Sequence, residues 1–235
     1  MLLEVKDLEV AYGDYQVVWG VSLSVSAGES VALLGPNGSG KSTVVNTISG
    51  LVASKAGDIR FEGNSLVGKP THTRASLGIA HVLERRRVFP HLTVLQNLNL
   101  GAWHSAAKAA RAKTTERVFS LFPRLSERKS QLARTLSGGE QQMLALGRGL
   151  MSLPRLLMVD EPFLGLAPQV MEQMKSVFET LKAEGMAILF IEQNVRIALA
   201  MAARGYILES GRLAIAGPSS ELVDSPEVRR IFLGG

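Results

Sequence analysis

Residues 35–43, with the sequence GPNGSGKST, decide the fold of this 235-residue chain. The segment matches the phosphate-binding pattern G-x-x-x-x-G-K-[ST] in full. Glycines let backbone N–H groups curve around phosphates, and the helix that follows points its positive end at the same anion. We therefore expect a nucleoside triphosphate to bind along the whole loop: Gly35, Pro36, Asn37, Gly38, Ser39, Gly40, Lys41, Ser42 and Thr43.

The segments on both sides of this loop predict an α/β protein. An apolar run before the loop predicts a buried strand over 30–34, and a helix is expected over 41–49. The N-terminal residues predict two strands of an antiparallel part, over 2–11 and 17–25. The fold class we expect is α/β: a P-loop NTPase core of mainly parallel sheet, with an N-terminal antiparallel β part and an inserted helical subdomain. The predicted division is a single domain over 1–235, with core segments 1–92 and 155–235 and the helical subdomain over 93–154.

Composition narrows the function classes without choosing one. The chain has 26 Lys and Arg against 21 Asp and Glu, and a net charge of +5 suits a polyanionic ligand, an anionic membrane or no particular partner. The absence of cysteine excludes disulfides, iron–sulfur clusters and thiolate zinc sites. No apolar run reaches the roughly 18 residues of a membrane span. Nucleic-acid binding is not expected, because no groove-reading or aromatic-interleaved motif accompanies the basic residues.

A second motif, LLMVDE over 156–161, supplies the carboxylates that nucleotide hydrolysis needs. Asp160 and Glu161 follow a buried strand, at the edge where open α/β sheets bind ligands. We expect Lys41 to reach the β and γ phosphates of ATP, and Ser42 and Asp160 to hold Mg²⁺. Glu161 is then positioned to deprotonate the attacking water. An apolar strand ending in Asp-Glu is weak evidence alone and becomes strong beside the phosphate loop.

A third motif, LSGGEQQ over 136–142, resembles the signature of ATP-binding cassette (ABC) proteins. The resemblance covers nearly the whole chain and implies that two such subunits sandwich two ATP molecules head to tail. Ser137, Gly138 and Gly139 would then contact the γ-phosphate held by the partner's loop, and Tyr12 would stack on adenine. Without the other motifs, a helix N-cap would be the favoured explanation of the SGG segment, and an isolated tyrosine is more often core or surface packing.

Three departures from the common cassette pattern narrow the resemblance. Glu84 replaces a glutamine, Gln193 replaces a switch histidine, and Ala167 stands where a carboxylate is usual. Together with RRVFP, EQN, LGLAP and FLGG, they resemble the smaller ATP-binding subunit of high-affinity branched-chain amino-acid importers, apart from Arg85, where that subfamily usually has glycine. The resemblance gives Glu84 and Gln193 catalytic positions, and Glu84 can also serve Mg²⁺. Importers of urea or short amides, and non-transport ABC ATPases acting on nucleic acid or ribosomes, are the alternatives.

The resemblance also implies partners. It implies transmembrane permease subunits, a second and non-identical ABC ATPase subunit, an extracytoplasmic substrate-binding protein acting indirectly, and a place at the cytoplasmic face of the membrane. The isolated chain would be able to homodimerise. In the stretch VLERRRVFP, over 82–90, we expect Glu84 to act on the nucleotide and Arg86, Arg87 and Phe89 on a permease helix. A solvated charge run is the alternative for any one of the arginines.

Overall fold

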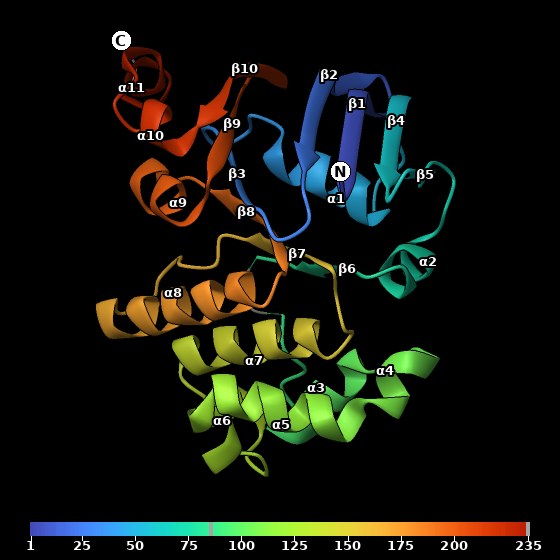
Figure 1. Cartoon of the computed structure of the whole chain (residues 1–235), viewed down its shortest axis with the longest axis vertical. Helices are drawn as coiled ribbons and strands as arrows, with labels where there is room; N and C mark the ends of the chain where they lie inside the picture. The colour runs from blue at the N-terminus through green and yellow to red at the C-terminus, as the bar shows by residue number, and fades with distance from the viewer. Residues whose placement is uncertain (85–86, 234–235) are drawn as a thin grey trace.

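The computed structural model describes residues 1–84 and 87–233, the last of these by its backbone only, and its strands form two sheets (Figure 1). The larger sheet has the strand order β10-β9-β3-β8-β7-β6 and is parallel except at β10, which pairs antiparallel with β9. All residues of β3, β7 and β8 are buried, as expected for parallel strands covered on both faces. The strands are β3 (Ser30–Leu34), β6 (Ile79–Val82), β7 (Leu156–Asp160), β8 (Ala187–Glu192), β9 (Arg204–Glu209) and β10 (Arg212–Pro218).

The smaller sheet is antiparallel and covers one side of the first helix. Its strand order is β2-β1-β4-β5. Val44, Val45 and Ile48 of that helix, α1, share one buried apolar cluster with strands of both sheets. The elements are β1 (Leu3–Tyr12), β2 (Tyr15–Val25), β4 (Ala56–Phe61), β5 (Asn64–Ser65), α1 (Lys41–Ser49) and α2 (Thr71–Ser76).

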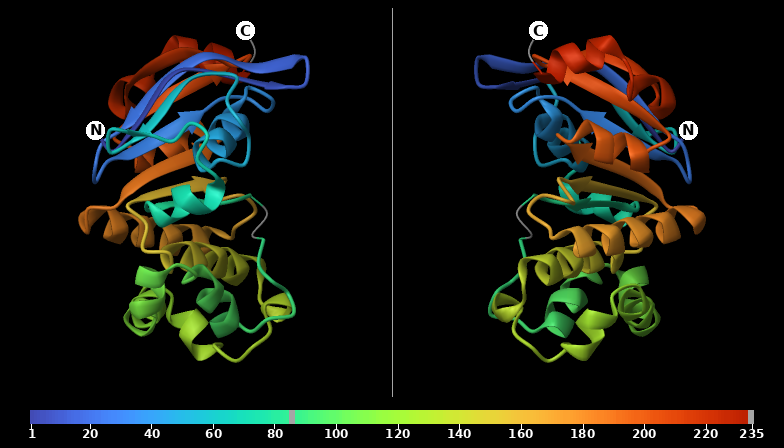
Figure 2. Two further views of the ribbon diagram at one scale, coloured as in Figure 1. Left: turned by 90° about the vertical axis from the view of Figure 1, so that its right-hand side faces the viewer. Right: turned by 90° about the vertical axis from the view of Figure 1, so that its left-hand side faces the viewer.

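Helices between β6 and β7 gather at one end of the molecule, away from the antiparallel sheet (Figure 2). The first of them begins at a capping box between Thr93 and Gln96. Gly147 lets the helices approach closely, since a Cβ there would lie 2.9 Å from Val118 Cγ1 and 3.1 Å from Leu98 Cδ2. The helices are α3 (Val94–Gly101), α4 (Ser105–Ala109), α5 (Arg111–Leu121), α6 (Pro123–Glu127), the 3₁₀ turn η1 (Ala133–Thr135) and α7 (Gly138–Leu150).

The remaining helices cover the larger sheet from the second half of the chain. Aromatic rings fasten α8 to it: Phe178 packs edge to face on Phe163 and on Phe190 of β8. No helix in the described part of the chain is both long and apolar enough to cross a membrane. The helices are α8 (Pro168–Ala183), α9 (Val195–Met201), α10 (Ser219–Leu222) and α11 (Pro226–Leu233).

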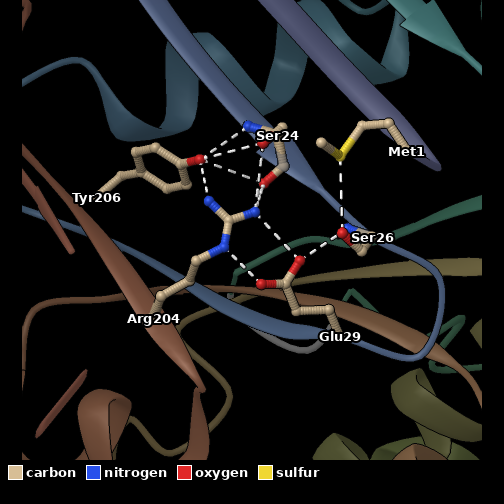
Figure 3. Close-up of polar contacts among 6 residues, drawn as sticks. All are labelled: Met1, Ser24, Ser26, Glu29, Arg204 and Tyr206. Carbon is tan, nitrogen blue, oxygen red and sulfur yellow. Dashed lines mark hydrogen bonds and ion pairs between the residues drawn. The ribbon is translucent and has the colours of Figure 1, made fainter. Parts of the chain in front are cut away.

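A polar cluster around Arg204 joins the two sheets (Figure 3). The guanidinium of Arg204, on β9, pairs with Glu29 just before β3 and donates from Nη2 to Ser24 O on β2 at 2.6 Å. Tyr206 OH accepts from Ser24 N at 3.0 Å. Burial alone would raise the pKa of Glu29, but its hydrogen bonds to Arg204 and Ser26 lower that pKa below its usual value. The cluster therefore fixes the antiparallel sheet against the parallel one.

The predicted fold class is confirmed, including the antiparallel part and the helical insertion. The strand and helix next to the phosphate loop occupy the predicted residues, 30–34 and 41–49. Sequence reasoning missed β4, the third strand of the antiparallel sheet, because its polar–apolar alternation is confined to the four residues of DIRF. The division at residues 93 and 154 remains a prediction.

Candidate functional site

A glycine-lined loop leads from β3 into α1 at the carboxyl edge of the parallel sheet. Gly35 has φ 151°, and a Cβ built on it would lie 2.3 Å from Leu208 O and 2.5 Å from Ser39 Oγ. Gly40, the N-cap of α1, has φ 100°. These positions require glycine, because a side chain would collide with β9 or strain the backbone. The loop therefore presents backbone N–H groups and the positive end of α1 to an anion.

Lys41, the first residue of α1, turns its ammonium group back onto the loop. Nζ donates to Gly35 O at 2.7 Å and to Pro36 O at 3.0 Å. Burial lowers the pKa of Lys41, and nearby carboxylates, first among them Glu161, oppose that shift. Ser39 Oγ is buried and has no hydrogen-bond partner in the described part of the chain. A phosphate group fits both features, since it would accept from the ammonium group and from the orphaned hydroxyl.

Asp160 ends β7 and is 7% exposed. Burial is the largest cause that raises its pKa to about 6; Glu161 and Glu84 add to the rise, while Lys41 and a hydrogen bond with Ser42 oppose it. One carboxylate and one hydroxyl suit Mg²⁺, which usually completes its shell with phosphate oxygens and water. In residues 1–84 and 87–233, no group of three or more His, Asp or Glu side chains forms a metal cage by itself. The residues thus fit a metal ion that arrives with a nucleotide.

Glu161 and Gln193 face each other across the same pocket. Gln193 Nε2 donates to Glu161 Oε1, and Glu161 N donates to Ile191 O at 2.8 Å. Glu161 has φ 46°, in the left-handed region that non-glycine residues seldom adopt. The pocket has a volume of about 610 Å³, and Glu161, Gln193 and Glu84 line it together with Val17, Leu164 and residues 37–43. Predicted site residues from four separate segments therefore meet at one place.

Glu192 is a residue that sequence reasoning missed. It ends β8, is 5% exposed, and accepts hydrogen bonds from Phe163 N at 3.4 Å and Gln193 N at 3.2 Å. Burial, with a further contribution from Glu161, raises the pKa of Glu192 to about 7, although the N–H groups of Phe163, Asn194 and Gln193 oppose the shift. The available signal was a carboxylate closing the otherwise apolar run AILFIE.

Tyr12 lies beside Thr43, the last residue of the phosphate-loop motif. Its OH is 3.5 Å from Thr43 Oγ1, and the residue is 49% exposed, so its ring is open to a ligand.

The signature residues lie outside the 610 Å³ pocket, as far as the described residues define it. Ser137 caps α7 through a capping box with Glu140, in which Ser137 Oγ accepts from Glu140 N at 3.3 Å. Gly139 faces α8, since a Cβ there would lie 2.8 Å from Val170 Cγ1. The N-cap reading of this segment is thus correct, and its exposed end leaves a role toward a second subunit open.

A second pocket, of about 550 Å³, lies between the parallel sheet and the helical insertion. Phe89, Leu100 and Trp103 line it and are each at least 40% exposed. Arg87 and Arg148 also line it; Arg148 Nη2 donates to Arg87 O at 2.7 Å and its guanidinium lies 5.1 Å from the centre of the Phe89 ring. Arg85 and Arg86 lie outside the described residues. The stretch 82–90 therefore reaches both pockets, with Glu84 at the first and Phe89 at the second.

Asn97 holds the wall of this second pocket in place. Its side chain accepts from Phe89 N at 2.8 Å and donates to Phe89 O at 3.0 Å and Thr93 O at 3.0 Å. Asn97 is fully buried, so these bonds fix the loop that enters α3.

Comparison with known proteins gives consistent matches. The ABC transporter family model matches residues 18–164. The chain is 44% identical over 234 residues to the high-affinity branched-chain amino acid transport ATP-binding protein BraG of Pseudomonas aeruginosa, covering 100% of both chains. It is 32% identical to the lipopolysaccharide export system ATP-binding protein LptB of Escherichia coli, covering 99% of this chain and 97% of that one. The solved ADP conformation of an ATP-binding cassette of an ABC transporter is similar at a TM-score of 0.86 and 27% identity, covering 100% of this chain and 99% of that one.

Proposed function

Because the chain belongs to the ABC transporter family and is an ATPase of that family, we propose that it hydrolyses MgATP to drive import of branched-chain or other hydrophobic amino acids through partner membrane subunits. The observation that carries the choice of substrate is the full-length similarity to the Pseudomonas branched-chain amino acid transport protein. The observation that supports the chemistry is the meeting of Lys41, Glu161 and Gln193 at one pocket.

In this proposal the phosphate loop binds the triphosphate of ATP. Lys41 exchanges its two loop carbonyl acceptors for β- and γ-phosphate oxygens, which are stronger acceptors because they carry charge. Ser42 and Asp160 would hold Mg²⁺, which would neutralise charge on the phosphates. Tyr12 stacks on the adenine.

Glu161 acts as the general base on the attacking water. The side chain of Gln193 orients the Glu161 carboxylate by donating to Oε1, and Glu84, which lines the same pocket, would contribute to the water or metal shell. The γ-phosphate also needs donors from outside this chain's own pocket. We propose that Ser137, Gly138 and Gly139 supply them to the partner ATPase subunit in a head-to-tail dimer, which is either a heterodimer or, for the isolated chain, a homodimer.

The second pocket is the proposed docking site for a helix of a permease subunit. Its exposed apolar side chains, Phe89, Leu100 and Trp103, would be covered by such a helix, and Arg87 adds charge at its rim. In the proposed division, Leu100 and Trp103 belong to the helical subdomain over 93–154, whereas Arg87 and Phe89 belong to the ATPase core. The chain would then work as a peripheral subunit at the cytoplasmic face of the membrane, with a substrate-binding protein acting on the other side.

A second candidate is an ATPase that powers lipopolysaccharide export, because the chain also resembles an Escherichia coli protein of that system over nearly its full length. Purification of the tagged chain from its native membrane separates the two proposals. Recovery of amino-acid permease subunits and a second, different ATPase would support import. Recovery of lipopolysaccharide export proteins would replace it, and recovery of ribosomes or DNA without membrane proteins would refute a transport function.

The proposed base is tested by Glu161→Gln. The variant should bind MgATP with unchanged affinity but hydrolyse it about 10² to 10⁴ times more slowly, the usual scale for loss of a positioned base. It should also accumulate as a nucleotide-bound dimer in size-exclusion chromatography. Lys41→Ala is the matched contrast, because it should weaken nucleotide binding itself. Turnover near wild type in Glu161→Gln would remove Glu161 from this role.

A further inference from the structure

Glu192 occupies a place where a carboxylate is costly. It is 5% exposed at the end of a strand whose other residues are apolar, and no ion pair to it is found in the described part of the chain. Lys41 interacts with Glu192 through its charge but forms no ion pair with it, and burying a carboxylate without a contacting cation lowers stability unless hydrogen bonds compensate. An apolar side chain at this position would stabilise the strand more than a carboxylate does. The carboxylate must therefore have a role other than stabilising the sheet.

The hydrogen bonds of Glu192 connect two segments that are distant in sequence. Oε1 accepts from Phe163 N at 3.4 Å, on the loop after Glu161, and Oε2 accepts from Gln193 N at 3.2 Å, at the start of the turn into α9. The side chain of Gln193 in turn donates to Glu161. These contacts close a ring, from Glu192 to Phe163, along the chain to Glu161, and back through Gln193.

Glu161 needs such support because of its backbone. A residue held at φ 46° is strained and keeps that conformation only when its surroundings impose it. Glu161 N bonds to Ile191 O, the residue before Glu192, so the end of β8 restrains both the backbone and the side chain of Glu161.

We infer that Glu192 is a positioning residue for hydrolysis: its carboxylate fixes the Phe163 loop relative to Gln193 and thereby aims the Glu161 carboxylate at the pocket. The inference rests on the proposed role of Glu161 as base. Glu192 itself would contact neither the nucleotide nor the attacking water. It acts on the rate of the chemical step and leaves nucleotide binding to the phosphate loop.

The test compares Glu192→Gln with wild type, measuring kcat, KM for MgATP and the affinity for a fluorescent ATP analogue. Glutamine keeps the size of the side chain but replaces one acceptor oxygen by an NH₂ group that opposes a backbone N–H. We expect kcat to fall about 10- to 100-fold, the scale of losing one hydrogen bond to a charged acceptor. KM and nucleotide affinity should stay within about twofold, because the loop contacts are untouched.

Glu29→Gln is the matched control, since it changes a half-buried carboxylate just before β3, on the same sheet's neighbouring strand, that serves the Arg204 cluster. It should lower the unfolding midpoint without lowering kcat more than about twofold. If Glu192→Gln also keeps kcat within twofold, the positioning role is refuted and Glu192 is only a structural cap.

The double variant Glu192→Gln with Gln193→Ala adds a test that does not depend on stability. If Glu192 acts through Gln193, the double variant should be no slower than about the slower single variant. If the losses in kcat of the two single variants multiply in the double variant, Glu192 does not act through Gln193. Glu161→Gln, measured in parallel, separates the two hypotheses: full turnover there refutes the proposed base, whereas full turnover in Glu192→Gln beside an inactive Glu161→Gln refutes the positioning role alone.

Discussion

Replacing Glu192 by glutamine should also change how the stability of the nucleotide-free chain depends on pH. Burial, with Glu161 adding to it, raises the pKa of Glu192 from 4.5 to about 7. Between these two values the folded chain keeps a proton on this carboxyl that the unfolded chain has released. The stabilisation from this group is therefore complete below pH 4.5 and is lost as the pH rises through about 7.

The magnitude follows from the two pKa values. Each pH unit over which one state holds an extra proton changes the free energy of unfolding by about 1.4 kcal/mol. Wild type should therefore lose about 2 kcal/mol from this group between pH 5.5 and pH 8, which corresponds to about 4–8 °C in Tm for a chain of this length. Asp160, whose pKa is raised to about 6, adds its own loss of stability over the same pH range in both wild type and Glu192→Gln. The difference between wild type and Glu192→Gln isolates Glu192.

The assay is urea unfolding at both pH values, with EDTA and without nucleotide. Wild type should lose about 2 kcal/mol more of its free energy of unfolding between pH 5.5 and pH 8 than Glu192→Gln does. Glu192→Gln therefore becomes relatively more stable at high pH, although it is the slower enzyme. Glu29→Gln is the control: hydrogen bonds to Arg204 and Ser26 outweigh burial and lower the pKa of Glu29, so its contribution is lost only in acid. It should lower stability equally at both pH values. A parallel pH dependence of wild type and Glu192→Gln would refute the reasoning.

Three further predictions concern the glycines of the phosphate loop, the Tyr12 ring, and the arginines after Glu84. Gly35→Ala should abolish nucleotide binding and lower the free energy of unfolding by about 2–4 kcal/mol, because its Cβ would lie 2.3 Å from Leu208 O. Gly38 has open space around it, so Gly38→Ala should lower the free energy of unfolding, measured by thermal unfolding, by only about 1 kcal/mol. Tyr12→Ala should weaken MgATP binding by about 1–3 kcal/mol but leave the affinity for inorganic triphosphate unchanged, and equal losses for both ligands would contradict stacking on adenine. Charge reversal at Arg86 and Arg87 should leave nucleotide affinity unchanged and reduce transport in reconstituted vesicles in a salt-dependent way; equal losses in both assays would assign the arginines to the nucleotide.

The local motifs could be interpreted from the sequence because each is complete within a few residues. The strand, the glycine loop and the helix around Lys41 are determined by residues next to one another in the chain. Their bounds could therefore be predicted without knowing the rest of the molecule. The carboxylates of LLMVDE could be placed for a similar reason, since the carboxyl end of a parallel strand lies beside the phosphate loop in any such sheet. These short-range signals were sufficient for the α/β fold class and for an ATPase site.

Tertiary structure decided the features that depend on residues far apart in the chain. Glu161 and Gln193 are 32 positions apart, and only the pairing of β7 with β8 brings their side chains together. Glu192 is one position from Gln193, yet its role could not be predicted, because burial of its carboxylate and its bond to Phe163 N exist only once β8 lies inside the sheet. The sequence by itself determined which chemical groups are available, through local pattern; the folded chain decided which of them touch, through strand order and burial.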